Sequence, residues 1–205
     1  MKRPGKIVCV GRNYRDHAKE LGNEVPAEPL LFLKPPSSVI GDGAPIVLPR
    51  ASKRVDFEGE IGVVLGRALR RAAPDDARGA IAGVVAVNDV TARDLQKSDG
   101  QWTRAKGFDS FCPLGPAPVA ADDLDALTVV TRVNGDERQR GSAADMVFDI
   151  PRLLAYISGI MTLEPGDLVA TGTPAGIGPL APGDVVEVEI VGVSRVSNPV
   201  IAETD

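Results

Sequence analysis

Residues 55–65 carry the side chains whose types and spacing are best suited to chemistry. Apolar and polar residues alternate along this stretch, so that Asp56, Glu58 and Glu60 share one face of a predicted strand. Carboxylates about 7 Å apart on one face repel each other unless water or a cation lies between them. Their oxygens are also the ligands that Mg²⁺ and Mn²⁺ prefer. Spacing alone favours a solvated strand face, and a metal site is the alternative.

Asp89 is a candidate for a third metal ligand. It follows the apolar run of residues 80–87 after a single asparagine. A carboxylate at the end of a buried strand lies at the mouth of a pocket as readily as in solvent. An aspartate that opens a turn or a helix explains the same position equally well.

The single histidine of the chain, His17, lies three residues before Glu20. Residues three apart in a helix face the same way, and a carboxylate beside an imidazole fixes its tautomer and raises its basicity. Such a pair can take a proton from water. On spacing alone an ordinary surface pair is favoured, just as a surface position is favoured for Lys106.

Strand patterns dominate the elements that would position these side chains. Apolar or alternating stretches predict strands at residues 7–10, 30–33, 55–65, 84–87, 127–133, 168–170 and 185–190. Helices are fewer: Asn13 can cap a short one that runs to Leu21 and stops at Gly22, and Pro74 and Asp149 can begin two more. We therefore predict a β-rich α+β fold, with residues 1–205 as a single domain.

Two further segments bear on function. Residues 14–27 are polar, contain Gly and Pro and surround the histidine, which is typical of a mobile lid and also of a plain surface loop. Residues 171–178 are Gly-rich but lack the pattern of a phosphate-binding loop, so we exclude nucleotide binding there and predict a tight turn.

Composition limits the partners and the compartment. The chain is 43% hydrophobic and 25% charged with a net charge of −5 and no basic patch, which argues against nucleic acid and anionic membranes as partners. Two distant cysteines, Cys9 and Cys112, indicate a reducing compartment rather than a disulfide framework. No apolar stretch has the length of a signal peptide or a membrane span. We predict a cytoplasmic protein.

Six short strings must be considered together: Gly11-Arg-Asn-Tyr-Arg-Asp-His17, Phe32-Leu-Lys-Pro35, Asp56-Phe-Glu-Gly-Glu-Ile-Gly62, Asn88-Asp-Val-Thr-Ala-Arg-Asp94, Ala105-Lys-Gly-Phe-Asp109 and Thr171-Gly-Thr-Pro174. In this order and spacing they resemble the fumarylacetoacetate hydrolase family, nearest to its short, single-domain branch of acylpyruvases and oxaloacetate decarboxylases. The resemblance covers nearly the whole chain. It implies a mixed β-sheet roll of the fumarylacetoacetate hydrolase type with few short helices, and a homodimer.

The resemblance also implies a role for individual residues. The matched positions make Glu58, Glu60 and Asp89 the ligands of Mg²⁺ or Mn²⁺, which reverses the preference for a solvated face, and they leave Asp56 out of the site. The implied catalytic residues are His17, Glu20 and Lys106. The implied substrate-binding residues are Arg12, Gln96 and Thr173.

The expected activity is hydrolysis of a carbon–carbon bond in acylpyruvate-type 2,4-dioxo acids through a metal-stabilised pyruvate enolate. Oxaloacetate decarboxylation or tautomerisation, and isomerisation of the 2-hydroxyhepta-2,4-diene-1,7-dioate type, are the alternatives, because the same ligands serve every enolate. Outside enzymes, the alternative is a metal-stabilised ligand-binding module. The expected partner is a small oxo acid.

Overall fold

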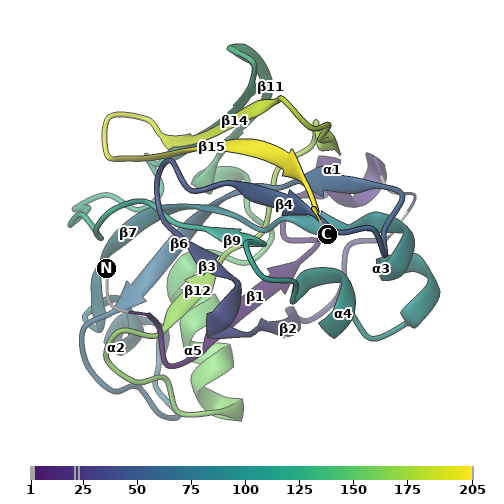
Figure 1. The fold of residues 1–205 in the computed structure, drawn as a ribbon. Coiled ribbons are helices and arrows are strands. Elements are labelled where there is room, and N and C mark those ends of the chain that lie inside the picture. The colour runs from purple at the N-terminus through teal and green to yellow at the C-terminus, as the bar shows by residue number, and fades with distance from the viewer. Residues whose placement is uncertain (1–2, 21, 23, 205) are drawn as a thin grey trace.

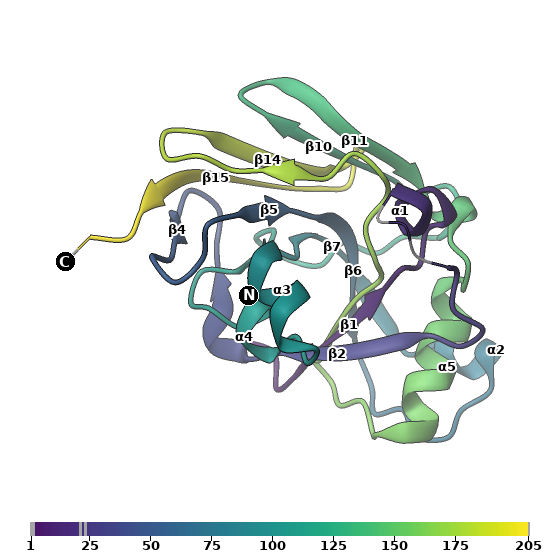
Figure 2. The same cartoon turned by 90° about the vertical axis from the view of Figure 1, so that its right-hand side faces the viewer.

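Two five-stranded sheets, one above the other, form the frame of the protein (Figures 1 and 2). The computed structural model describes residues 3–20, 22 and 24–204. Within them, the first sheet has the order β2 (Leu30–Lys34), β1 (Ile7–Gly11), β12 (Leu168–Ala170), β6 (Gly59–Leu65) and β7 (Ile81–Asn88). The second has the order β11 (Asp136–Ser142), β10 (Thr128–Val133), β14 (Val185–Ile190), β15 (Ser194–Ala202) and β4 (Ile46–Leu48).

Both sheets are mixed. Strand β1 runs parallel to β12, and β15 runs parallel to β4, whereas β6 pairs antiparallel with β12 and β7. Two small sheets lie beside them, one of β13 (Gly178–Pro179), β5 (Val55–Phe57) and β8 (Thr91–Ala92), the other of β3 (Val39–Ile40) and β9 (Cys112–Pro113). The predicted β-rich α+β fold with mixed sheets is confirmed.

The helices are short and lie around the sheets. They are α1 (Arg15–Glu20), α2 (Pro74–Arg78), α3 (Arg93–Asp99), α4 (Thr103–Lys106) and α5 (Ile150–Ile160), with 3-10 turns η1 (Pro36–Ser38) and η2 (Ala143–Asp145). The predicted start of α5 is confirmed, because the Asp149 side chain accepts a hydrogen bond from the Arg152 N–H at 2.8 Å. None of the described helices combines the length and the apolar character needed to cross a bilayer.

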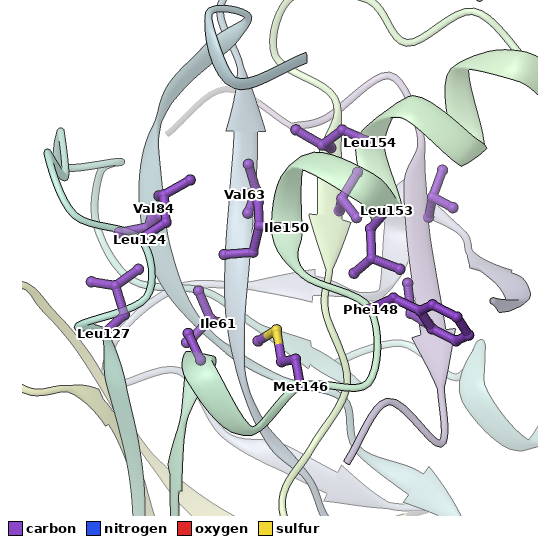
Figure 3. Packing of buried hydrophobic residues seen from close by; sticks show 14 of the residues in the cluster. Ile61, Val63, Val84, Leu124, Leu127, Met146, Phe148, Ile150, Leu153 and Leu154 are labelled. Atoms are coloured by element: carbon purple, nitrogen blue, oxygen red, sulfur yellow. The ribbon is translucent and has the colours of Figure 1, made fainter. Parts of the chain in front are cut away.

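The largest hydrophobic cluster lies between α5 and the first sheet (Figure 3) and extends to Val129 and Val188 of the second sheet. Ile150, Leu153 and Leu154 of the helix pack against Ile61 and Val63 of β6. These apolar residues recur at helical spacing on α5 and at alternate positions on β6, so each element buries one continuous face. The packing fixes β6, which carries one of the candidate ligands, within the protein interior.

The predicted continuous strand at residues 55–65 is interrupted at Glu58, so β5 and β6 belong to different sheets. The Glu58 N–H donates to the Asn88 side chain at 3.0 Å, and the Glu58 carbonyl accepts from the Asp89 N–H at 2.8 Å. Hydrogen bonds to the last residue of β7 and to the residue after it therefore hold Glu58 at this position. Asp56, Glu58 and Glu60 are all buried, so the solvated-face interpretation of these acidic residues is wrong.

Asn13 does not cap α1, contrary to the sequence prediction. Its buried side chain donates to the carbonyls of Phe148 and Thr171, at 3.1 and 2.8 Å, and accepts from the Phe148 N–H. The Oδ1 atom, which a helix cap would use, is therefore bonded to Phe148 instead. The predicted helix end at Leu21 lies outside the described residues, and Gly22 beyond it has a φ of +68°.

Candidate active site

Three buried carboxylates converge at the junction of β5, β6 and β7. Oxygens of Glu58, Glu60 and Asp89 all lie within 4.8 Å of one another. The antiparallel register pairs Gly59 with Asn88, so Glu58 lies opposite Asp89 and Glu60 follows two residues along the chain. Their exposed fractions are only 5%, 1% and 1%. The structure thus brings together the three predicted ligands.

Two buried lysines partly neutralise this cluster. The Lys106 ammonium lies 2.8 Å from Glu58 Oε2 and 2.6 Å from Asp89 Oδ2. Lys34 approaches from the other side, 2.7 Å from Asp89 Oδ1 and 3.1 Å from the Val90 carbonyl. Burial lowers the pKa of Lys106, but the charges of Asp89 and Glu58 outweigh it and raise that pKa to about 12. Lys106 is therefore a permanent cation here, and a surface position for it is ruled out.

Glu60 differs from its two neighbours because no cationic side chain within the described residues contacts it. Its Oε2 accepts a hydrogen bond of 2.8 Å from the Gly172 N–H. Burial, together with the charges of Asp89 and Glu58, raises the pKa of Glu60 well above its ordinary value. Burial also acts to raise the pKa of Glu58, but Lys106 and Arg93 hold it well below its ordinary value. A divalent cation among the three carboxylates would relieve the charge on Glu60, so the donor set fits a hard metal ion.

A cavity of about 470 Å³ opens onto the cluster, and most of the predicted site residues line it. His17, Lys106, Arg12, Gln96 and Thr173 do so together with the three carboxylates. Its other lining residues are Val10, Gly11, Phe32, Arg93, Lys97 and Trp102. Glu20 lies behind the histidine instead, with its Oε2 3.3 Å from His17 Nδ1. The structure therefore assembles all nine predicted residues around one cavity.

Three of the lining residues have constrained polar groups. The Gln96 carbonyl accepts from Arg93 at 2.6 Å, which leaves its NH₂ group to donate into the cavity. The Thr173 hydroxyl donates to the Gly59 carbonyl at 2.9 Å. Arg12 has a φ of +59°, which is uncommon outside glycine and indicates that the chain is constrained beside the cavity.

Comparison with known proteins identifies the family. The family model described as the C-terminal domain of fumarylacetoacetate (FAA) hydrolase matches residues 6–201. The chain belongs to this family. The fumarylacetoacetate hydrolase resemblance of the motifs and the prediction of an enzyme are thereby confirmed.

Relatives within the family carry the names of several related activities. An oxaloacetate tautomerase of Bacillus subtilis is 42% identical over 96% of this chain and 70% of its own length. The mitochondrial oxaloacetate decarboxylase of Dictyostelium discoideum is 45% identical over 91% of this chain and 89% of its own. A solved 2-hydroxyhepta-2,4-diene-1,7-dioate isomerase of Mycobacterium marinum is 44% identical, with a TM-score of 0.91 and coverage of 99% of this chain and 77% of that one.

Several residues of this fumarylacetoacetate hydrolase-type site could not be recognised from the sequence. Lys34 and Arg93 both lie within the matched strings but were assigned no role. Arg93 contacts Asp56 at 3.0 Å and Glu58 at 2.5 Å, so it holds Glu58 in place and explains why Asp56 is not in the cluster. Phe32 and Trp102, at a centroid distance of 5.2 Å, form an aromatic wall of the cavity. Alternation of residue types in a single segment cannot reveal partners that come from other segments.

Helix α1 places His17 at the cavity. His17 is 4% exposed, and Glu20 accepts a hydrogen bond of 3.1 Å from the Gly176 N–H in the Gly-rich turn. Glu20 thus links α1 both to the histidine ring and to the turn that follows Thr173. Opening and closing of residues 14–27 stays a prediction.

Replacing Lys34 by methionine should destabilise the metal-free protein. Lys34→Met keeps the length of the side chain but removes a buried cation, whose Nζ contacts Asp89 and Val90. Asp89 still has its ion pair with Lys106. We therefore expect the free energy of unfolding to fall by about 3 kcal/mol, at the low end for breaking a buried ion pair. Urea unfolding with a chelator present measures it, with Lys53→Met at an exposed position as the matched control. Equal stability of the two variants would contradict this role.

Proposed function

We propose that the protein is a divalent-metal enzyme that converts small 2-oxo dicarboxylic acids through their enolates, with oxaloacetate as its type substrate. The observation that carries this proposal is the cluster of Glu58, Glu60 and Asp89 in a cavity that also exposes cationic side chains. The names of the tautomerase and decarboxylase relatives support the same substrate class.

The charges around the cavity favour a dianion. Three carboxylates face two buried ammonium groups, those of Lys34 and Lys106, which leaves one net negative charge. A bound divalent cation would reverse that sign. Arg12 and Lys97 add two cations to the lining, and no ion pair holds either within the described part of the chain. The positive charge of Arg93 is balanced by the carboxylate of Asp56. A substrate with two carboxylates therefore fits this field better than one with a single carboxylate.

The residues of the chain then have separable roles. A divalent cation held by Glu58, Glu60 and Asp89 would act as a Lewis acid toward the keto group and the enolate. Lys106 supplies a fixed positive charge beside developing negative charge. His17, oriented by Glu20, takes the proton from the carbon next to the keto group and returns it. Arg12 and Lys97 bind the distal carboxylate.

A second candidate is hydrolysis of acylpyruvates, the activity expected from the sequence. The observation that favours it is the distance of 3.3 Å between His17 and Glu20, because a histidine paired with a carboxylate can activate water. In this reaction the water attacks the distal carbonyl and the bond to the enolate carbon breaks. The two candidates share the metal site and differ in what His17 deprotonates.

The deciding experiment is a screen with Mg²⁺ and Mn²⁺ of oxaloacetate, acetylpyruvate and longer acylpyruvates. Keto–enol interconversion is followed by ultraviolet absorbance, and pyruvate formation by a coupled assay. We expect oxaloacetate to be converted faster than the monoanionic acetylpyruvate. Conversion of acylpyruvates alone would favour the hydrolase. Absence of turnover with every oxo acid would instead favour a ligand-binding module.

Arg12→Met should separate dicarboxylic from monocarboxylic substrates. Loss of a charged contact to the distal carboxylate should raise KM for oxaloacetate about 10-fold or more, and KM for acetylpyruvate little. Steady-state kinetics on both substrates measure the difference, and Arg138→Met, at an exposed position on β11, is the control. The same KM change for both substrates would mean that Arg12 does not contact a second carboxylate.

The predicted homodimer and cytoplasmic location accompany this proposal. They are predictions of the family resemblance and of the cysteine usage, and light scattering with size-exclusion chromatography tests the first.

A further inference from the structure

Gln139 is a buried amide on a strand that is otherwise mostly exposed. Strand β11 is the outermost strand of the second sheet, next to β10 (Figure 2). Gln139 on β11 lies opposite Thr131 on β10. Only 1% of its surface is exposed, whereas Arg138 and Arg140 beside it face solvent. A buried glutamine needs partners for both ends of its amide, so the identity of those partners reveals its role.

All three side-chain hydrogen bonds of Gln139 go to segments of the candidate active site. The Oε1 atom accepts from the Gly59 N–H at 2.9 Å. The NH₂ group donates to Thr173 Oγ1 and to the Pro174 carbonyl, each at 2.7 Å. Backbone N–H groups can only donate and carbonyls can only accept, which fixes the orientation of the amide. A single side chain from the second sheet thus joins the metal-ligand strand to the Gly-rich turn.

The first of these bonds acts on the residue between two candidate ligands. Gly59 separates Glu58 from Glu60, and a Cβ at this position would lie 1.9 Å from Thr131 Oγ1. The start of β6 is therefore packed directly on β10, with Gln139 satisfying its free N–H group.

The second bond acts on the hydroxyl that lines the cavity. Thr173 Oγ1 has one proton, which it donates to the Gly59 carbonyl, and it accepts a hydrogen bond from Gln139. The bond from Gln139 does not use that proton. The oxygen can therefore stay in place while its proton turns from Gly59 to a carboxylate in the cavity.

We propose that Gln139 is a positioning residue that holds the Thr173 hydroxyl ready to bind the substrate carboxylate; this rests on the proposed binding of 2-oxo acids at the metal site. Without Gln139, the hydroxyl loses the contact that fixes its oxygen, and the turn at Pro174 loses its link to β11. Binding of the 2-oxo acid weakens because the hydroxyl must then be ordered at the moment of binding.

The test is a double-mutant cycle on oxalate binding, with Gln139→Met, Thr173→Val and the double variant at saturating Mg²⁺. Oxalate is a stable dianion with the same pair of chelating oxygens as a 2-oxo acid. Gln139→Met should weaken oxalate binding about 10- to 100-fold in calorimetry, the usual effect of removing a group that orients a ligand-binding residue. In the Thr173→Val background the same change should have little further effect, because Gln139 acts through Thr173.

Controls separate this role from simple stabilisation. Gln101→Met, at an exposed glutamine, should bind oxalate like the wild type. If Gln139→Met does not fold, Gln139→Asn keeps a buried amide that is too short to reach both Gly59 and Thr173, and the cycle is repeated with it. Equal losses of oxalate affinity in both backgrounds, or no loss in either, would overturn the proposal for Gln139. Failure of the wild type to bind oxalate would instead overturn the proposed function.

Discussion

Glu60→Gln is expected to yield a folded protein that no longer binds Mg²⁺ or Mn²⁺ and has lost its metal-dependent activity. The amide keeps the size of the side chain and can still accept the hydrogen bond from Gly172. It removes the negative charge that makes the three-carboxylate cluster attractive to a divalent cation. Groups that only orient a ligand typically contribute about 10- to 100-fold to metal affinity, so loss of the ligand charge itself should cost more.

Glu58→Gln is the matched comparison, because it should have the same effect on metal binding and the opposite effect on stability. Burial and the charges of Asp89 and Glu58 raise the pKa of Glu60, so its ionised form destabilises the metal-free fold. The stability contributed by protonated Glu60 is complete below its unfolded pKa and is lost as pH rises through its folded pKa. Without metal at neutral pH, Glu60→Gln should therefore be more stable than Glu58→Gln.

At residue 58 the effect of the ionised carboxylate on stability has the opposite sign. Lys106 and Arg93 hold the pKa of Glu58 below its ordinary value despite its burial, so its ionised form stabilises the fold at neutral pH. Glu58→Gln removes one of the two carboxylates that contact Lys106 and one of the two that contact Arg93, so that only Asp89 and Asp56 remain, and it should lower the melting temperature. Calorimetric metal titration and thermal melts in chelator measure both properties. Activity of Glu60→Gln that survives chelation and dialysis would refute Glu60 as a ligand.

The sequence was sufficient to predict most of the main strands and the residues around the cavity. The predicted strands at residues 168–170 and 185–190 coincide with β12 and β14, because both are apolar or strictly alternating. Strand β15 was missed, since it contains Pro199 and several polar residues, and its pattern appears only once Val196 and Val200 are seen to be buried. Local pattern alone therefore detects strands with a strong apolar signal.

The candidate active site shows a second limit of prediction from the sequence. Spacing alone favoured a solvated face for Glu58 and Glu60, and only the motif resemblance reversed that preference. The deciding physical fact is the interruption of the strand at Glu58, which depends on hydrogen bonds to Asn88 and Asp89, thirty residues later in the chain. Lys34 and Gln139 could not be found by pattern, because their roles come from contacts with Asp89, Gly59 and Thr173 across long sequence separations.

His17→Ala is expected to reduce acylpyruvate hydrolysis much more than oxaloacetate decarboxylation. Hydrolysis needs an activated water, whereas decarboxylation needs only an electron sink at the keto group. His17 lines the cavity and Glu20 lies 3.3 Å from its Nδ1, so the pair is placed to remove a proton from water. Loss of a general base typically costs about 10²–10⁴-fold.

Both reactions should be measured on the same His17→Ala preparation at saturating Mg²⁺, together with oxalate affinity. The three candidate ligands come from β6 and from the ends of β5 and β7, and none comes from α1, so oxalate should still bind. Glu20→Gln provides a graded control: its amide oxygen can still accept from Gly176, but it no longer supplies a charge to the imidazole. We expect a smaller loss of hydrolysis there than with His17→Ala.

Equal losses of both reactions in His17→Ala would mean that the histidine closes the cavity or positions substrate for either reaction. Unchanged rates for both would mean that His17 and Glu20 take no part in hydrolysis or decarboxylation.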